Sequence, residues 1–156
     1  MKTRFNRFTN IAGYLALAAG VVVVALLVFT SNENRKHEID TSIGAVLYAT
    51  SCAACHGANL QGETDWQTPK SDGILPAPPH DEDGHTWHHS DNLLFTYTKL
   101  GGAEALAQSG VANFNSGMPA FEGILSDEEI EAILGYIKST WPERIREIQQ
   151  ERTKAE

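Results

Sequence analysis

The pattern of hydrophobic and polar positions divides this chain into two unlike parts. Residues 11–29 contain no charged side chain and form one apolar run. A helix of this length is about 28 Å long, close to the hydrocarbon thickness of a bilayer. The run is longer than the apolar core of a secretory signal peptide, and no small-residue cleavage site follows it. The pattern therefore predicts an uncleaved transmembrane anchor at 11–29 rather than a cleaved signal.

The rest of the chain shows helical spacing of apolar residues, interrupted by long loops. An amphipathic helix is predicted from Thr41 into a pair of cysteines, and residues 57–90 are predicted to be loop because they are rich in Gly, Pro, Asp and His. Ser90 is the expected N-cap of a helix over 91–100 that Gly101-Gly102 ends. Ser126, followed three residues later by glutamate, forms a capping box that opens another helix. With almost no strand signal, the expected fold class is all-α.

These patterns also predict how the chain is organised. The long loops need a large apolar group around which to fold, because the expected helices bury little by themselves. A cytoplasmic N-terminus is predicted at 1–10, a transmembrane anchor at 11–29 and a polar connector at 30–40. A helical domain follows at 41–141, and a charged tail at 142–156. The tail is expected to be a helical extension with little to bury.

Charge differs sharply between the two parts. Residues 1–30 hold three basic and no acidic residues, so all 20 acidic residues lie in 31–156. With nine Lys and Arg, residues 31–156 carry a formal charge of 9 minus 20, or −11. The basic residues before the apolar run place the N-terminus in the cytoplasm and export the remainder. The acidic excess disfavours nucleic acid and favours a protein partner with a basic docking face.

Cys52 and Cys55 are the only cysteines, in the segment SCAACHG at 51–57. A disulfide across so tight a loop stabilises little, and a thioredoxin-like pair needs a βαβ setting that is absent from the pattern. Zinc would need further ligands, which the histidines at 80–89 could supply. His56 favours haem, because Cys-X-X-Cys-His holds the group by two thioether bonds and presents its histidine to the iron. We therefore predict one covalently attached haem c.

A second axial ligand is expected on the opposite face of the haem. Electron-transfer haems usually take Met or His in that position. Met118 is the only methionine besides Met1, and it lies between Gly117 and Pro119 in a loop. A lone Met is usually core filler, but filler is expected on an apolar helical face. His56 and Met118 are the predicted axial ligands.

These motifs, in this order, resemble the class I cytochrome c family. The resemblance rests on SCAACHG after a helix with Gly44 and Tyr48, then ANLQG, GMPAF and LSDEEIEAILGYIKSTWP, and it covers roughly residues 41–141. It implies a small cytochrome c fold, with three or more helices around one covalent haem, here after one N-terminal transmembrane helix. It also implies that the first and last helices cross near Gly44.

The resemblance further implies a proline carbonyl that accepts a hydrogen bond from Nδ1 of the proximal histidine. The candidates are Pro69, Pro76, Pro78 and Pro79. The stretch between Gly62 and Ser90 that contains them is longer than in the smaller family members.

The function implied by the resemblance is electron transport rather than enzymatic turnover. With its N-terminal span, the chain is similar to membrane-anchored bacterial cytochromes c that connect a quinol-oxidising complex with a terminal oxidase. It would carry single electrons on the periplasmic side of the cytoplasmic (inner) membrane as a single-pass protein. Two alternatives stay open: a fixed haem c subunit of an oxidoreductase complex, and a haem- or metal-responsive sensor.

The sensor alternative depends on a histidine-rich stretch that contains His80, His85, His88 and His89. His85 and His89 would share one face of a helix, an arrangement that can bind zinc or copper or offer an alternative iron ligand. We favour a polar loop that leads into the Ser90 cap, with Trp87 covering a haem edge and its indole N–H directed at a propionate. Asn113 and Asn115 are candidates to orient the Met118 sulfur or to bind a propionate.

Overall fold

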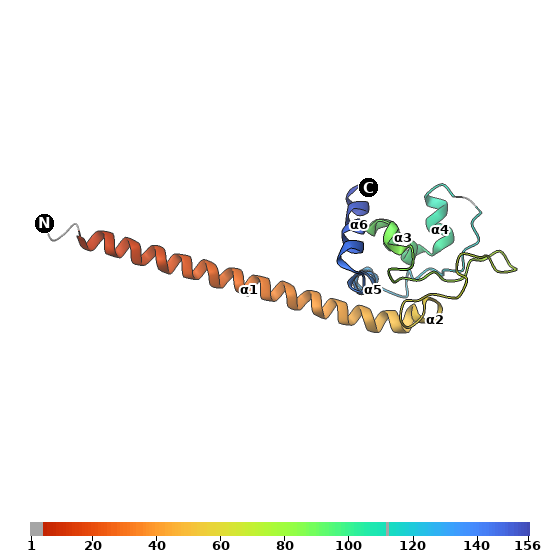
Figure 1. Cartoon of the computed structure of the whole chain (residues 1–156), viewed down its shortest axis with the longest axis horizontal. Helices are drawn as coiled ribbons and strands as arrows, with labels where there is room; N and C mark the ends of the chain where they lie inside the picture. The colour runs from red at the N-terminus through yellow and green to blue at the C-terminus, as the bar shows by residue number, and fades with distance from the viewer. Residues whose placement is uncertain (1–4, 112) are drawn as a thin grey trace. The chain divides into compact units, whose positions relative to one another are not determined.

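In the computed structural model of the chain, the regular elements are helices joined by loops (Figure 1). It describes the backbone of residues 5–111 and 113–156, and the side chains of 14–33, 41–111 and 113–156. The helices are α1 (Phe5–Ser51), α2 (Ala53–His56), the 3₁₀ helix η1 (Thr86–His88), α3 (Asp91–Leu100), α4 (Gly102–Gln108), α5 (Asp127–Ser139) and α6 (Glu143–Lys154). Within the described residues, the only β pairing is an isolated bridge between Glu122 and Leu125. The predicted all-α fold class is confirmed.

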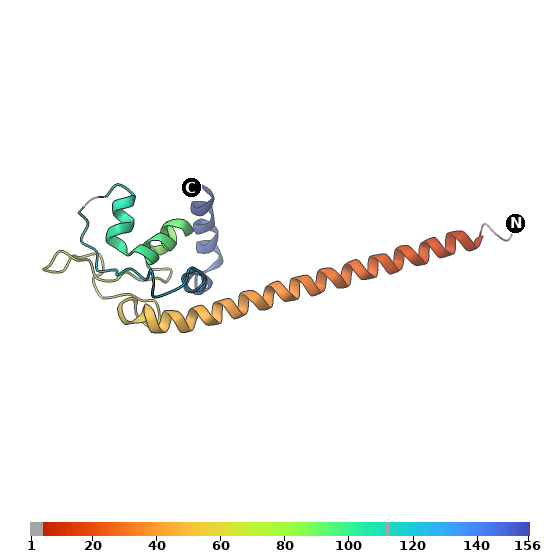
Figure 2. The same cartoon turned by 180° about the vertical axis from the view of Figure 1, so that it is seen from behind.

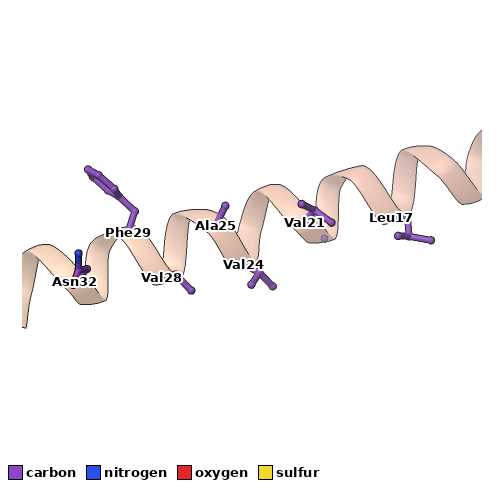
Figure 3. Close-up of a pocket in the computed structure, with 8 residues that line it drawn as sticks. Leu17, Val21, Val24, Ala25, Val28, Phe29 and Asn32 are labelled. Atoms are coloured by element: carbon purple, nitrogen blue, oxygen red, sulfur yellow. The ribbon is translucent and has the colours of Figure 1, made fainter.

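The chain forms two compact units, Met1–Ile39 and Asp40–Glu156, which are described separately. In the N-terminal unit, Tyr14–Glu33 of α1 is long and apolar enough to cross a membrane, a test that an N-terminal signal sequence also passes. Figure 3 shows Leu17, Val24 and Val28 projecting from this helix, and the side chains of the stretch are exposed. The predicted connector at 30–40 is helical, and residues 1–4 of the predicted N-terminus lie outside the described residues.

The core of the second unit, hereafter the domain, forms where the end of α1 meets α5. A Cβ atom at Gly44 would collide with the carbonyl oxygen of Ala132 and would lie 2.9 Å from Cβ of Tyr136. The two helices therefore approach so closely that only glycine fits. Around this crossing the core buries mainly Tyr48, Ile130, Ile133, Ile137 and Trp141. The predicted crossing of the first and last helices of the family fold at Gly44 is confirmed.

The helix boundaries follow the caps that the sequence predicts. The Ser90 hydroxyl accepts a hydrogen bond from the Leu93 N–H at 3.2 Å and opens α3. Gly101 ends α3 with a φ of 79°, a left-handed conformation that suits glycine. Ser126 opens α5 with both hydrogen bonds of the capping box present. Gly101 alone separates α3 from α4, which begins at Gly102, and a Cβ at Gly102 would collide with Ser116 and Tyr97.

Helix α6 differs from the expected charged tail. Gln149 is only 2% exposed, and its amide donates hydrogen bonds to the carbonyl of His89 and to the Asp91 carboxylate. The Thr153 hydroxyl accepts the Asp91 N–H at 3.1 Å, and Lys138 pairs with the same aspartate at 2.8 Å. Both views place α6 beside α3 (Figure 2). The helix was predicted correctly, but it packs on the domain through polar groups as well as Ile145, and the polar contacts are not revealed by an apolar pattern.

Candidate haem-binding site

One turn of helix carries the cysteine motif. Helix α1 ends at Ser51, and the short α2 follows with the His56 N–H bonded to the Cys52 carbonyl at 3.0 Å. Cys52 and Cys55 are both free thiols, the first buried and the second exposed. Burial, together with the neighbouring Cys55, raises the pKa of Cys52 to about 11. The Tyr48 hydroxyl closes the turn by donating to the Gly57 carbonyl at 3.1 Å.

His56 is oriented by a single proline carbonyl. The residue is 7% exposed, and its Nδ1 lies 2.8 Å from the Pro78 carbonyl oxygen. Nδ1 therefore carries the proton, which leaves the lone pair on Nε2. Burial lowers the pKa of His56, against the opposing effects of the Pro78 bond and the Glu63 charge. Among the candidate prolines, the structure selects Pro78.

His80 occupies an unexpected position against this ring. The His56 and His80 ring centroids are 3.9 Å apart, and the His80 backbone is held by the Leu60 carbonyl and the Trp141 indole, each at 2.7 Å. His80 Nδ1 is buried and has no partner among the described residues. Burial, with smaller effects of the other histidines, lowers the pKa of His80 to about 3.

This position corrects the sequence analysis for one residue. The sequence places His80 in a polar loop and leaves it open as an alternative iron ligand. A ring that contacts His56 cannot also lie across a porphyrin from it, so His80 does not suit the opposite axial position. Nothing in the local sequence around His80 signals burial, because residues distant in the chain, among them His56 and Trp141, surround it.

Met118 comes from a loop that is fixed against the junction of α3 and α4. Its carbonyl accepts the Gly102 N–H, and its own N–H donates to the Ser116 hydroxyl, both at 3.1 Å. A Cβ atom at Gly101 would lie 2.8 Å from the Ala120 nitrogen, so the loop and the junction are in close contact. The thioether side chain is partly buried. The backbone of the predicted second ligand is therefore well defined.

The Asn115 side chain contacts the backbone of a neighbouring loop. Its side-chain N–H donates to the Asp72 carbonyl at 3.2 Å, which ties the Met118 loop to residues 62–77. Asn113 adopts a left-handed conformation with a φ of 62°. The predicted contact of Asn115 with the sulfur or a propionate stays a prediction, since its side chain keeps a second N–H and an oxygen.

The donor set and its surroundings fit a covalent haem. Two free thiols, an imidazole with an available Nε2 and a partly buried thioether are the groups that such a haem requires. Apolar side chains of α3, α4 and the loop before α5 are only partly buried, as expected where an apolar group completes the core: Leu93, Leu94, Phe95, Leu100, Leu106 and Phe121.

His85 and His88 stack on tryptophan rings. His85 lies parallel to Trp66 at 5.2 Å between ring centroids, and His88 stacks on Trp87 at 3.6 Å. The rings of His85 and His89 are 5.3 Å apart, but no group of three or more metal-binding side chains gathers anywhere in the described part of the chain. The Trp87 indole N–H donates to the Glu82 carbonyl at 3.2 Å, so it is engaged within its own loop rather than directed at a propionate.

Comparison with known proteins agrees with this geometry. A model of the cytochrome c family matches residues 42–141. The chain belongs to the cytochrome c family. Members of the family are electron carriers rather than enzymes, exchange electrons with redox protein partners and hold a covalent haem c, of which this domain takes one.

Two curated relatives are distantly similar cytochromes c6. The protein of Gracilaria tenuistipitata var. liui is 28% identical over 110 residues, which cover 70% of this chain and 82% of the relative. The protein of Picosynechococcus sp. (strain ATCC 27264 / PCC 7002 / PR-6) is 33% identical over 98 residues, which cover 63% of this chain and 71% of the relative. No solved structure matches the chain.

Proposed function

We propose that this cytochrome c is tethered to the inner membrane and carries single electrons between respiratory complexes on the periplasmic side. Residues 11–29 would be the anchor, 30–40 the connector and 41–141 the electron-carrying domain. The observation that carries the proposal is the His56 imidazole, fixed by Pro78 with Nε2 free, directly after two free thiols.

The proposed roles of the site residues follow from their chemistry. Cys52 and Cys55 would form the thioether bonds, and His56 and Met118 would be the axial ligands. When bound, haem c supplies a one-electron Fe(III)/Fe(II) couple. Pro78 holds the His56 proton on Nδ1, and the buried surroundings keep water away from the imidazole. With both axial positions taken by side chains, no coordination position is left for a substrate.

The acidic surface supports the choice of partners. Residues 31–156 carry a formal charge of −11, so a donor and an acceptor with basic docking faces would be attracted. A quinol-oxidising complex as donor and a terminal oxidase as acceptor fit a tethered carrier on the periplasmic side. The apolar stretch Tyr14–Glu33 is the feature that favours tethering.

The axial ligands are tested by spectroscopy of the full-length, haem-loaded chain in detergent. The oxidised parent is expected to show the weak iron–sulfur charge-transfer band, and Met118→Ala is expected to lose it and to bind carbon monoxide when reduced. Met118→His is expected to lose the band but to stay six-coordinate, because imidazole replaces the thioether.

A matched control is the double variant His85→Ala/His89→Ala, which should keep the band. A parent without the band, or a Met118→Ala variant that retains it, would show that Met118 is not a ligand. Carbon monoxide binding by the reduced parent at neutral pH would favour the sensor alternative.

A further inference from the structure

The loop at residues 63–77 is closed at its base by one glutamate. The Glu63 N–H donates to the Ala77 carbonyl at 2.8 Å, and the Ala77 N–H donates back to Glu63 Oε2 at 2.7 Å. The other carboxylate oxygen of Glu63 accepts from Lys70 Nζ at 3.0 Å. Glu63 therefore makes a backbone hydrogen bond, a side-chain hydrogen bond and an ion pair, and both of its carboxylate oxygens accept hydrogen bonds.

This closure lies next to the proline that orients His56. Ala77 directly precedes Pro78, whose carbonyl accepts the hydrogen bond from His56 Nδ1. On the other side, a Cβ atom at Gly62 would lie 2.7 Å from the Pro78 carbonyl carbon. The backbone at Pro78 is thus packed closely against Gly62 and lies next to the Glu63–Ala77 hydrogen bonds.

The negative charge of Glu63 is close enough to act on His56. The Glu63 carboxylate accepts the Ala77 N–H at 2.7 Å, one residue before the proline whose carbonyl lies 2.8 Å from His56 Nδ1, so its charge lies near the imidazole. A nearby anion stabilises the more positive state of any centre to which the imidazole is bound. Lys70 opposes this effect, and water screens both charges because the two side chains are 50% and 42% exposed.

We propose that Glu63 is a positioning residue that holds the Pro78 carbonyl against His56 and lowers the midpoint potential of the haem, while Lys70 raises it. This inference rests on the proposed role of His56 as the proximal ligand. It assigns a function to the long loop after Gly62: the loop places one charge pair beside the proximal ligand.

The test measures the midpoint potential of the full-length, haem-loaded chain in detergent. Glu63→Gln keeps an acceptor for the Ala77 N–H but removes the charge, so the potential should rise. Lys70→Met removes the opposing charge, so the potential should fall. Each shift should correspond to about a twofold to tenfold change in the electron-exchange equilibrium constant, where tenfold equals 59 mV for one electron.

Glu131→Gln is the matched control, because it changes net charge equally from an exposed position on α5. The potential of this variant should move much less, and the Glu63→Gln shift should shrink as salt is added. A Glu63→Gln shift no larger than the control shift overturns the inference. Shifts of the same sign in Glu63→Gln and Lys70→Met also overturn it, because they indicate distortion of the loop rather than charge.

The iron–sulfur band separates this inference from the proposed function. A parent without the band contradicts the axial ligands, whatever the potentials do. A parent and variants that keep the band, with unmoved potentials, contradict only the role of Glu63. If Glu63→Gln loses the band, the Lys70→Met variant decides the question. A lower midpoint potential in Lys70→Met supports the charge effect, and an unchanged potential overturns the inference.

Discussion

At the scale of single residues, the domain depends on positions that have no room for a side-chain atom. Gly44 is the sharpest case, since a Cβ atom there would collide with the backbone of Ala132. Gly135 lies on α5, the helix that contains Ala132, and has nothing within 4 Å of an added Cβ. Two glycines thus contribute in opposite ways: one permits a helix crossing, and the other only weakens its helix.

Substitution by alanine should separate these two glycines. Gly44→Ala should lower the free energy of unfolding by about 1–3 kcal/mol, because the methyl group forces α1 and α5 apart. Gly135→Ala should raise it by up to about 1 kcal/mol through helix propensity. Denaturant titration of the haem-loaded chain, followed by circular dichroism, measures both. Equal effects would show that the crossing tolerates a side chain.

Single residues also show where prediction from sequence ends. Cys52, Cys55 and His56 could be predicted because their relation is local: five consecutive positions define the motif. The partner of His56 could not, because four prolines were available and only the folded chain brings Pro78 to 2.8 Å. The burial of His80 and the closure by Glu63 escaped prediction for the same reason, as both arise from contacts across loops.

At the scale of elements, the helix-capping residues made the helix boundaries predictable from the sequence. The bounds predicted for α3 agree with Asp91–Leu100, because Ser90 and Gly101 are both strong local signals. The opening of α5 was predicted by its capping box in the same way. Helix α6 was predicted, but its packing was not, because a buried glutamine leaves no apolar periodicity in the sequence.

Gln149 should therefore be the residue that attaches α6. Gln149→Ala removes donors to the His89 carbonyl and the Asp91 carboxylate, and should lower the free energy of unfolding by about 1–3 kcal/mol. Gln150→Ala, at an exposed neighbouring position, should change it by less than about 0.5 kcal/mol. Thermal and denaturant unfolding of the two variants provide the comparison. Similar values would mean that α6 is not held by this amide.

At the scale of the whole molecule, the net negative charge and the apolar N-terminal stretch could be predicted from the sequence. Their effect on electron transfer depends on the charge of the reaction partner. The domain is an acidic body, and the N-terminal unit carries an apolar stretch with exposed side chains. Such a distribution favours fast association with cationic surfaces and slows approach to anionic ones.

Ionic strength should therefore have opposite effects on two electron-transfer reactions. With a small cationic oxidant, the second-order rate constant of the reduced chain should fall as ionic strength rises from about 0.01 to 0.15 M, where screening shortens the reach of charge. With an anionic oxidant the rate constant should rise, and with a neutral one it should stay constant. Stopped-flow absorbance measures all three. Responses of the same sign would contradict control by net charge.

The unequal cysteines have a consequence for how the molecule is assembled. Cys55 is exposed, whereas Cys52 lies in the hydrophobic core with a pKa of about 11. At pH 7 only on the order of one Cys52 in ten thousand is then a thiolate, the reactive form of the side chain. Bond formation at Cys52 is easiest while the chain is still open. The order of folding and haem attachment therefore matters. A polypeptide that folds before haem is attached buries the thiol of Cys52.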